Sequence, residues 1–317
     1  MDGHPDTPMS DDAMRIVTLL PGATEIVCAL GLADQLVAVS HECDYPEIVQ
    51  SLPKATRSNI SEGLSPKEVD DQVVQAVEAS KALYTVDGDL LATLRPDLIV
   101  TQGICDVCAV NYETLQETVD RLPDGMGESL ELVTLEGKSL DQILGDIERV
   151  ARATQTEATA ATLTQGLRRR WEALQNQRPS VQPRVLALEW PDPPFFGGHW
   201  VPEMIDVAGG IDVMGQAGVD SGRCSWQEIA DRDPDVILLI ACGFDLPRNV
   251  ELARHLYSQA DSARLRAVSE RRVWACDANA FFSRPGPRIV DGAEMLQAIF
   301  LGDTDGVSSV VQVLGSS

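Results

Sequence analysis

Lysine is scarce in this sequence. Four of the 317 residues are Lys, and Lys and Arg together number 25 against 49 Asp and Glu, which gives a net charge of −24. A chain this acidic repels the phosphates of nucleic acid, so nucleic acid is excluded as a partner. Acidic surfaces with few lysine stems are typical of proteins that stay dissolved where concentrated ions screen self-repulsion. We therefore expect a halophilic protein.

A long hydrophobic run is also missing. No stretch reaches the roughly 20 apolar residues that a membrane-spanning helix needs, so we expect no membrane span. The first twelve residues are polar and acidic, unlike the basic and then apolar segment of a signal peptide. We therefore expect a cytoplasmic protein, with an extracytoplasmic location as the alternative if a leader was omitted. Seven cysteines, an odd number, favour reduced thiols over a disulfide framework.

Motifs of the common enzyme classes are absent from the sequence. It has no nucleophile elbow, no phosphate-binding P-loop and no H-E-x-x-H metal motif. No sequence motif therefore indicates catalysis, and we expect a binding protein rather than an enzyme.

Two copies of one pattern organise the chain, at residues 98–108 and 236–244. Each copy is an apolar run that predicts a buried strand, contains cysteine at its end and follows a Pro-Asp pair. Short apolar runs that alternate with helical patterns are typical of parallel α/β units. We therefore predict an α/β fold with two Rossmann-like lobes, each with a parallel sheet. The ligand cleft is expected between the lobes, at the carboxyl ends of the strands.

The helical patterns predict how the chain is divided. The long pattern over residues 155–175 would span roughly 30 Å at 1.5 Å per residue, enough to connect two lobes. It is preceded by Ser139–Gln142, which has the spacing of a capping box. The predicted parts are a disordered N-terminus (1–13), an N-terminal α/β lobe (14–137), a helical connector (138–180), a C-terminal α/β lobe (181–302) and a tail (303–317).

Several short motifs, taken in order, resemble one known family. They are Ile16–Glu25, Ser40–Pro46 and Leu94–Val100 in the first half, and Pro193–Phe195, Ala208–Gly210 and Arg284–Ile289 in the second. In this order and spacing the chain resembles the cobalamin-binding proteins of ABC importers, a substrate-binding class with two α/β lobes joined by a rigid helix. The resemblance covers about residues 15–300. It implies that the protein binds cobalamin or a related corrinoid as its ligand, for corrinoid uptake.

Ten residues are candidate ligand contacts. The resemblance implies contacts from Tyr45, from the aromatic residues near Phe195 and Trp226, and from Arg284. Aromatic rings suit the faces of a flat macrocycle, and Arg donates to its amide carbonyls. The predicted strand ends and loops add the other candidates, which are Arg57, Glu189, Trp190, His199, Trp200 and Phe244.

The resemblance also implies a partner, an ABC permease that docks through one acidic residue on each lobe. Asp89 matches that position on the first lobe. On the second lobe the matching position is Gln227, with Glu228 beside it, which departs from the family's pattern.

A second interpretation starts from the cysteines. Cys105 and Cys108 form a C-x-x-C, Cys242 ends the second copy of the repeat, and His41 and Cys43 lie two residues apart, on one face of a regular strand. Thiolate and imidazole are ligands for zinc, iron and cobalt. If these side chains converge, they hold a transition metal, an iron–sulfur cluster or the cobalt of a corrinoid. An enzyme acting on a corrinoid is the third alternative.

Overall fold

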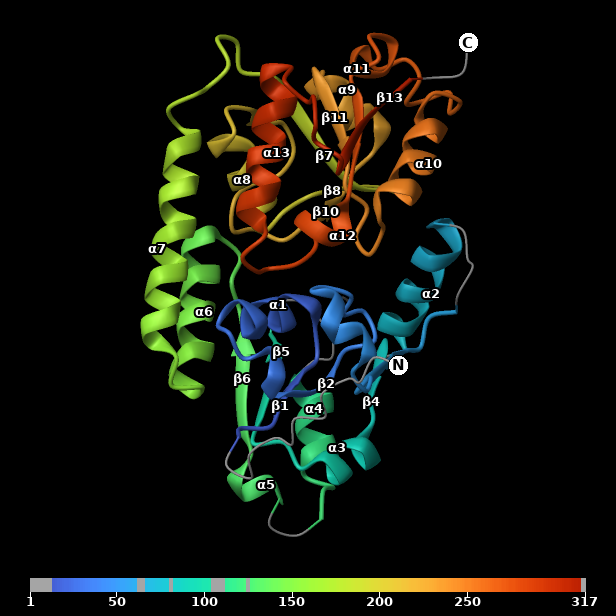
Figure 1. The fold of residues 1–317 in the computed structure, drawn as a ribbon. Helices are drawn as coiled ribbons and strands as arrows, with labels where there is room; N and C mark the ends of the chain where they lie inside the picture. The colour runs from blue at the N-terminus through green and yellow to red at the C-terminus, as the bar shows by residue number, and fades with distance from the viewer. Residues whose placement is uncertain (1–12, 62–65, 80–81, 104–111, 124–125, 315–317) are drawn as a thin grey trace, which may run out of the picture. The chain divides into compact units, whose positions relative to one another are not determined.

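The chain forms two compact units, each with its own sheet and core. A computed structural model describes residues 13–61, 66–79, 82–103, 112–123 and 126–314 (Figure 1). The first unit comprises Met1–Asn59, Ala82–Leu135 and Arg149–Thr156. The second comprises Ile60–Lys81, Glu136–Glu148 and Glu157–Ser317. The predicted cleft between lobes remains a prediction.

The first unit is built on a four-stranded parallel sheet in the order β2-β1-β5-β6. Strands β1, β2 and β5 are buried along their whole length, as expected for a parallel sheet covered on both faces. Strand β5 is the first copy of the repeat. The bounds are β1 (Ile16–Thr18), β2 (Leu36–Val39), β5 (Leu98–Gln102) and β6 (Glu131–Leu135).

Short helices and one hairpin complete this unit. Helix α1 begins at Pro21. Backbone N–H groups in the first turn of a helix have no partner within the helix, and proline suits this position because it has no N–H. Helix α3 is capped by Asp87, whose carboxylate accepts from the Leu90 N–H. The bounds are α1 (Pro21–Ala29), η1 (Ala33–Gln35), η2 (Glu47–Ser51), α3 (Gly88–Leu94), α4 (Tyr112–Val119), α5 (Met126–Ser129) and the antiparallel pair β3 (Thr56–Ser58) and β4 (Tyr84–Val86).

An apolar cluster contributes to the core of the first unit. It joins residues of the sheet to residues of α3 and α4, and burial of this apolar surface stabilises the unit by roughly 25 cal/mol per Å². Its fully buried members include Val17, Ala38, Leu91, Ile99 and Leu115.

The second unit contains a mixed sheet in the order β10-β8-β7-β11-β12-β13, with β9 also paired to β7. Strands β9, β7, β11 and β12 run parallel, whereas β8, β10 and β13 are antiparallel to their neighbours. The antiparallel edges differ from the parallel sheet that the sequence predicts. The bounds are β7 (Arg184–Pro191), β8 (Pro194–Phe196), β9 (Ile211–Asp212), β10 (Gly222–Arg223), β11 (Val236–Leu239), β12 (Val273–Cys276) and β13 (Val310–Val313).

Residues 303–317, expected to be a tail, include β13, which pairs with β12 along four residues. The Tyr257 hydroxyl donates to the Val313 carbonyl at 2.6 Å and ties this strand to α10. The helices of the second unit are α2 (Pro66–Glu78), α7 (Glu157–Leu174), α8 (Val201–Val207), α9 (Trp226–Arg232), α10 (Leu246–Leu256), α11 (Arg266–Ser269), α12 (Ala278–Phe281) and α13 (Ile289–Leu301).

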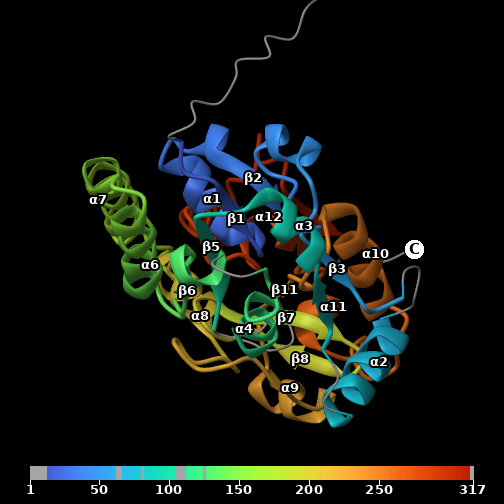
Figure 2. The ribbon, with the colours of Figure 1, turned by 90° about the horizontal axis from the view of Figure 1, so that it is seen from below.

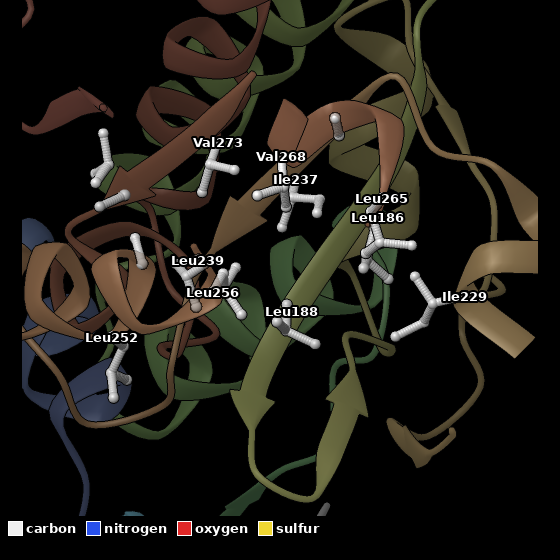
Figure 3. Packing of buried hydrophobic residues seen from close by; sticks show 14 of the residues in the cluster. Leu186, Leu188, Ile229, Ile237, Leu239, Leu252, Leu256, Leu265, Val268 and Val273 are labelled. Atoms are coloured by element: carbon white, nitrogen blue, oxygen red, sulfur yellow. The ribbon is translucent and has the colours of Figure 1, made fainter. Parts of the chain in front are cut away.

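The core of the second unit lies around β7, β11 and β12 (Figure 3). Leu186 and Leu188 come from β7, Ile237 and Leu239 from β11, and Val273 from β12. All five are fully buried. The apolar run of the second repeat therefore forms a central strand of this sheet, as its composition predicts.

Helix α2 belongs to the second unit although it lies between β3 and β4 in the sequence. Arg223 of β10 forms an ion pair with Asp70 of α2, with 2.7 Å between nitrogen and oxygen. Figure 2 shows β8, the strand with which β10 pairs, beside β7 in the second sheet. A sequence segment from the first half of the chain is thus attached to the second sheet.

Helix α7 matches the long pattern predicted over residues 155–175, and it follows α6 (Leu140–Ala153). Arg170 binds Asp291 and Glu294 of α13, and the Gln297 side-chain amide donates to the Leu174 carbonyl at 2.7 Å. Within the part of the chain that the structure describes, no helix combines the length and apolar character needed to cross a membrane.

Candidate functional site

The carboxyl end of β2 carries the His41–Cys43 pair. Strand β2 ends at Val39, and a turn follows in which the Cys43 N–H donates to the Ser40 carbonyl at 3.1 Å. The prediction that His41 and Cys43 share one face of a regular strand is therefore wrong, because the turn sends the two side chains to different partners.

His41 is half-buried and bound to Thr56 of β3. Its backbone N–H donates to the Thr56 Oγ1 at 3.1 Å, and its ring Nδ1 lies 2.7 Å from the same oxygen. Burial, helped by the positive charge of Lys54, lowers the pKa of His41. The ring of Tyr84 lies 5.7 Å away, centroid to centroid. These contacts favour a neutral imidazole.

Cys43 is buried against two threonines. Its Sγ lies 3.0 Å from the Thr24 Oγ1, which in turn lies 2.6 Å from the Thr18 Oγ1. The Lys54 ammonium donates to the Cys43 carbonyl at 3.1 Å. These contacts tie the loop after β2 to β1 and α1, which is a structural role.

A groove of about 920 Å³ lies beside the β3–β4 hairpin, α3 and α4. Arg57 lines it and forms an ion pair with Asp87 at 3.2 Å, and Asp89 lines the same groove. The sequence did not predict this groove. Tyr45, the other ligand candidate of the first unit, is 49% exposed in the loop after β2, so its ring is accessible to a ligand.

In the second unit, two aromatic candidates meet where neighbouring strands end. Trp190 lies near the carboxyl end of β7, and Phe244 follows β11. Their ring centroids are 5.3 Å apart with the planes tilted by 57°, an arrangement that aromatic pairs favour. The guanidinium of Arg248 lies over the Phe244 ring at 4.3 Å. The carboxyl ends of β7 and β11 therefore carry both aromatic surface and a positive charge.

The β7–β8 hairpin brings Phe195 next to this pair. Phe195 is the register partner of Trp190 across the two strands, and both side chains are half-buried. Glu189, one residue earlier on β7, is also half-buried. The structure therefore gathers Glu189, Trp190, Phe195 and Phe244 at one end of the sheet, and ligand contact by these residues stays a prediction.

His199 lies in the loop after β8 with a left-handed backbone (φ 55°). Its Nδ1 lies 3.4 Å from the Ser221 Oγ, and its Nε2 lies 3.4 Å from the Asp220 carboxylate, which also binds Lys138. Burial lowers the pKa of His199, against the opposing effect of Asp220. Both ring nitrogens therefore have protein neighbours.

Three further candidates are more enclosed. Trp200 is buried, and its indole N–H donates to the Phe282 carbonyl at 2.9 Å. Arg284 is only 4% exposed, and its charge acts on the half-buried Asp277. Trp226 is half-buried at the first position of α9 and packs against the core of the second unit. Ligand contact by these residues remains a prediction.

The two positions considered for permease docking differ in their local bonding. Asp89 is exposed in the first turn of α3. Glu228 instead caps its own helix, because its carboxylate accepts from the Ser225 N–H at 2.7 Å while Ser225 Oγ accepts from the Glu228 N–H. Gln227 donates to Asp231 at 2.8 Å.

The predicted metal cluster lies partly outside the described residues, because Cys105 and Cys108 fall there. Cys242 is exposed in the loop after β11. Among the residues that the structure does describe, no group of three or more His, Cys, Asp or Glu side chains could hold a metal ion.

The sequence prediction missed two contributors to these sites, Thr56 and Arg248. Thr56 follows His41 by fifteen residues, and no local pattern marked it. Arg248 follows Phe244 by four residues, across the start of α10, and this spacing is the signal that could have indicated a cation next to the ring.

Comparisons with known proteins agree with this architecture. A family model described as periplasmic binding protein matches residues 16–280. A vitamin B12-binding protein of Vibrio cholerae is 27% identical over 293 residues, which cover 90% of this chain and 88% of that protein. A vitamin B12-binding protein of Photorhabdus laumondii is 23% identical over 286 residues, covering 89% and 86%.

Solved structures show the same fold. The periplasmic heme-binding protein RhuT of Roseiflexus sp. RS-1 in apo form superposes with a TM-score of 0.70 at 23% identity, covering 92% of this chain and 99% of that one. The periplasmic vitamin B12 binding protein BtuF of Vibrio cholerae gives 0.66 at 24% identity, covering 92% and 98%. The α/β fold class and the resemblance drawn from the sequence motifs are thus confirmed. The prediction that the protein is not an enzyme is also confirmed, because the matched family consists of binding proteins.

Proposed function

Because the chain belongs to the family of periplasmic binding proteins, we propose that it binds cobalamin or a related corrinoid and delivers it for uptake. The observation that carries this proposal is the aromatic pair Trp190 and Phe244, 5.3 Å apart where two neighbouring strands end. Such a surface suits the face of a flat macrocycle. The names of the curated relatives support the choice of a corrinoid.

Charged side chains around the aromatic pair can form hydrogen bonds with the amide groups at the periphery of such a ligand. Arg248 lies over Phe244 at 4.3 Å, and it is exposed, so its remaining N–H groups can donate to amide carbonyls on the macrocycle. Glu189 can accept from amide N–H groups on the same fringe. Aromatic residues supply contact area, and these two polar residues supply orientation.

Heme is the competing ligand. Structural relatives that are described as heme-binding proteins include RhuT and BhuT, the second in complex with two hemes. Heme is also flat and metal-centred, but it carries carboxylates where a corrinoid carries amides. The net charge of −24 makes the dianionic heme the less favourable ligand.

We further propose an ABC permease as the partner, with Asp89 on the docking surface of the first unit. The family description and the titles of the relatives favour an extracytoplasmic site of action over the cytoplasmic one expected from the N-terminal sequence. Only one of the two acidic docking residues has its expected counterpart, because Gln227 stands at the second position, and the neighbouring Glu228 is engaged in capping α9.

The test is a calorimetric titration of the purified protein, freed of ligand, with cyanocobalamin and separately with hemin. We expect saturable one-site binding of cyanocobalamin and weaker binding of hemin. Trp190→Leu should lower the affinity for cyanocobalamin roughly 2- to 10-fold, since a stacked aromatic contributes about 0.5–1.5 kcal/mol beyond its area.

Trp274→Leu is the matched control, because Trp274 is also a half-buried tryptophan on a strand of the same sheet but is paired with Gln312 of β13. This variant should bind cyanocobalamin as the parent does. Absence of any binding of cyanocobalamin at millimolar concentration, together with tight binding of hemin, would replace the corrinoid by heme.

A further inference from the structure

A fully buried asparagine lies next to the loop that carries Phe244. Asn249 is the fourth residue of α10, and none of its surface is exposed to solvent (0%). Asparagine is a poor helix former, and a buried amide without hydrogen bonds destabilises a fold. A buried asparagine within a helix therefore points to specific hydrogen bonds made by its side chain.

The side chain of Asn249 joins the carboxyl ends of two neighbouring strands of the second unit. Its Oδ1 accepts from the Ala241 N–H at 3.0 Å, in the loop after β11. Its Nδ2 donates to the carbonyl of Cys276, the last residue of β12, at 3.0 Å and to that of Phe244 at 3.1 Å. This geometry uses the oxygen and both donors of the amide. Leucine or an ionised aspartate, which are close to asparagine in size, would supply neither donor.

The contacts of Asn249 are at both ends of one tight turn, residues 241–244. The Phe244 N–H donates to the Ala241 carbonyl at 3.0 Å and closes the turn. Gly243 has a φ of 77°, a conformation that glycine adopts without steric cost. The Phe244 carbonyl, besides its bond from Asn249, accepts from the Asn279 N–H at 3.1 Å. The backbone of Phe244 is therefore fixed through both its N–H and its carbonyl.

The ring of Phe244 depends on this backbone for its place. It lies 5.3 Å from the ring of Trp190, centroid to centroid, and Arg248 lies over it at 4.3 Å. Helix α10 thus contacts Phe244 twice, with Arg248 at the ring and with Asn249 at the backbone carbonyl. A loop that is ordered before the ligand arrives loses little conformational entropy on binding, which raises affinity.

We propose that Asn249 is a positioning residue, which holds the Phe244 ring against Trp190 and so sets the affinity for the ligand. The inference rests on the proposed function and extends it, because it assigns a role to a residue outside the ligand surface. Asn249 is fully buried, so its effect on the ligand passes through Phe244.

The test is a double-mutant cycle, in which cyanocobalamin is titrated calorimetrically into the parent, Asn249→Ala, Phe244→Ala and the double variant. We expect Asn249→Ala to lower the affinity of the parent roughly 2- to 10-fold, the effect of displacing an aromatic contact. In the Phe244→Ala background the same change should alter the affinity by less than about 2-fold, because the ring that Asn249 positions is absent.

Ser262→Ala is the matched control for loss of stability. Ser262 is also 0% exposed, and its hydroxyl donates to the Leu256 carbonyl at 2.7 Å, at the other end of α10. This variant should lower Tm and leave the affinity for cyanocobalamin unchanged. If Asn249→Ala does not fold, Asn249→Ser takes its place in the cycle, because it keeps a hydroxyl and leaves a smaller gap.

The outcomes distinguish this inference from the proposed function. An equal loss of affinity in both backgrounds, or a lower Tm without loss of affinity, overturns the positioning role and leaves the proposed function standing. If the parent binds hemin and not cyanocobalamin, the corrinoid proposal fails, and the same cycle titrated with hemin decides the role of Asn249. If neither ligand binds, the proposed function and the inference fall together.

Discussion

Asp70 and Arg223 form an ion pair across 153 residues of sequence, with 2.7 Å between Oδ1 and Nη2. Asp70 lies on α2, whose flanking strands β3 and β4 belong to the first unit, and Arg223 lies on β10 at the edge of the second sheet. The side chain of Asp70 is only 19% exposed. The ion pair therefore attaches α2 to the sheet of the second unit, although α2 lies between two strands of the first unit in the sequence.

We expect Asp70→Asn to loosen α2 without unfolding the second sheet. Loss of the pair should cost about 0.5–1 kcal/mol locally, the upper part of the range for accessible ion pairs. Backbone amides of α2 should therefore exchange with deuterium faster, as measured by mass spectrometry. Asp71→Asn is the matched control, because Asp71 is 54% exposed and its nearest cation, Lys67, is 3.9 Å away. Equal exchange in the two variants would contradict the assigned role.

Asp212 makes the stability depend on pH in a predictable direction. Burial raises the pKa of this carboxyl, although its Oδ1 accepts from the N–H groups of Met214 and Gly215 at 2.9 and 2.7 Å. A raised carboxyl pKa means that the folded state disfavours the charged form, so the charge destabilises the protein above the folded pKa. This penalty is relieved as pH falls.

Asp212→Asn keeps an oxygen for the two N–H groups and removes the charge. We expect the variant to be more stable than the parent at pH 7, with a difference that shrinks as pH falls toward the ordinary range of aspartate. Urea unfolding at several pH values measures this difference. A difference that stays constant between pH 7 and pH 4 would show that the charge of Asp212 is not its source.

The acidic composition predicts a response to salt. With 49 acidic and 25 basic residues, self-repulsion should decrease as ions screen it. Each kcal/mol of relieved repulsion raises Tm by roughly 2–4 °C in domains of 150–250 residues. Calorimetric scans in KCl from low ionic strength to the molar range should show a rising Tm. Sucrose of equal osmolality serves as the uncharged control, and a flat or falling curve in KCl would refute the halophilic interpretation.

The cysteines should differ in reactivity according to burial. Burial raises the pKa of the Cys28 and Cys224 thiols to about 11, and raises that of the fully buried Cys276 further. Cys242 is exposed. Because the thiolate is the reactive form, we expect that, of the five cysteines that the structure describes, iodoacetamide modifies Cys242 first and Cys276 only after unfolding. Peptide mass spectrometry follows the order, and early modification of Cys276 in the folded protein would contradict it.

Much of the fold could be predicted from the sequence because its signals are local. The apolar runs at residues 98–102 and 236–239 form buried strands, and the helical period over residues 155–175 forms α7 at Glu157–Leu174. The capping box at Ser139 is found only in part. The Ser139 Oγ accepts from the Gln142 N–H at 3.4 Å, but the Gln142 side chain accepts from the Lys138 N–H instead of that of Ser139.

The antiparallel strands of the second sheet could not be predicted. Strands β8 and β10 have three and two residues, too few to show a period of two. Strand β13 lies at the edge of the sheet and exposes the consecutive residues Val311 and Gln312, so its burial does not alternate. Their place depends on pairing with distant partners, which a single-sequence pattern does not contain.

Some features of the candidate site could likewise be predicted from the sequence, and others depend on the tertiary structure. The sequence by itself determined that Trp190 and Phe244 lie at the ends of strands, because strand length and alternation depend on neighbouring residues. Only the tertiary structure decided which rings meet, that His41 and Cys43 turn apart, and that the ring of His41 meets the Thr56 hydroxyl. Thr56 lies fifteen residues further along the chain, and a hydrogen bond of this kind exists only after the sheet and the hairpin have brought the two residues together.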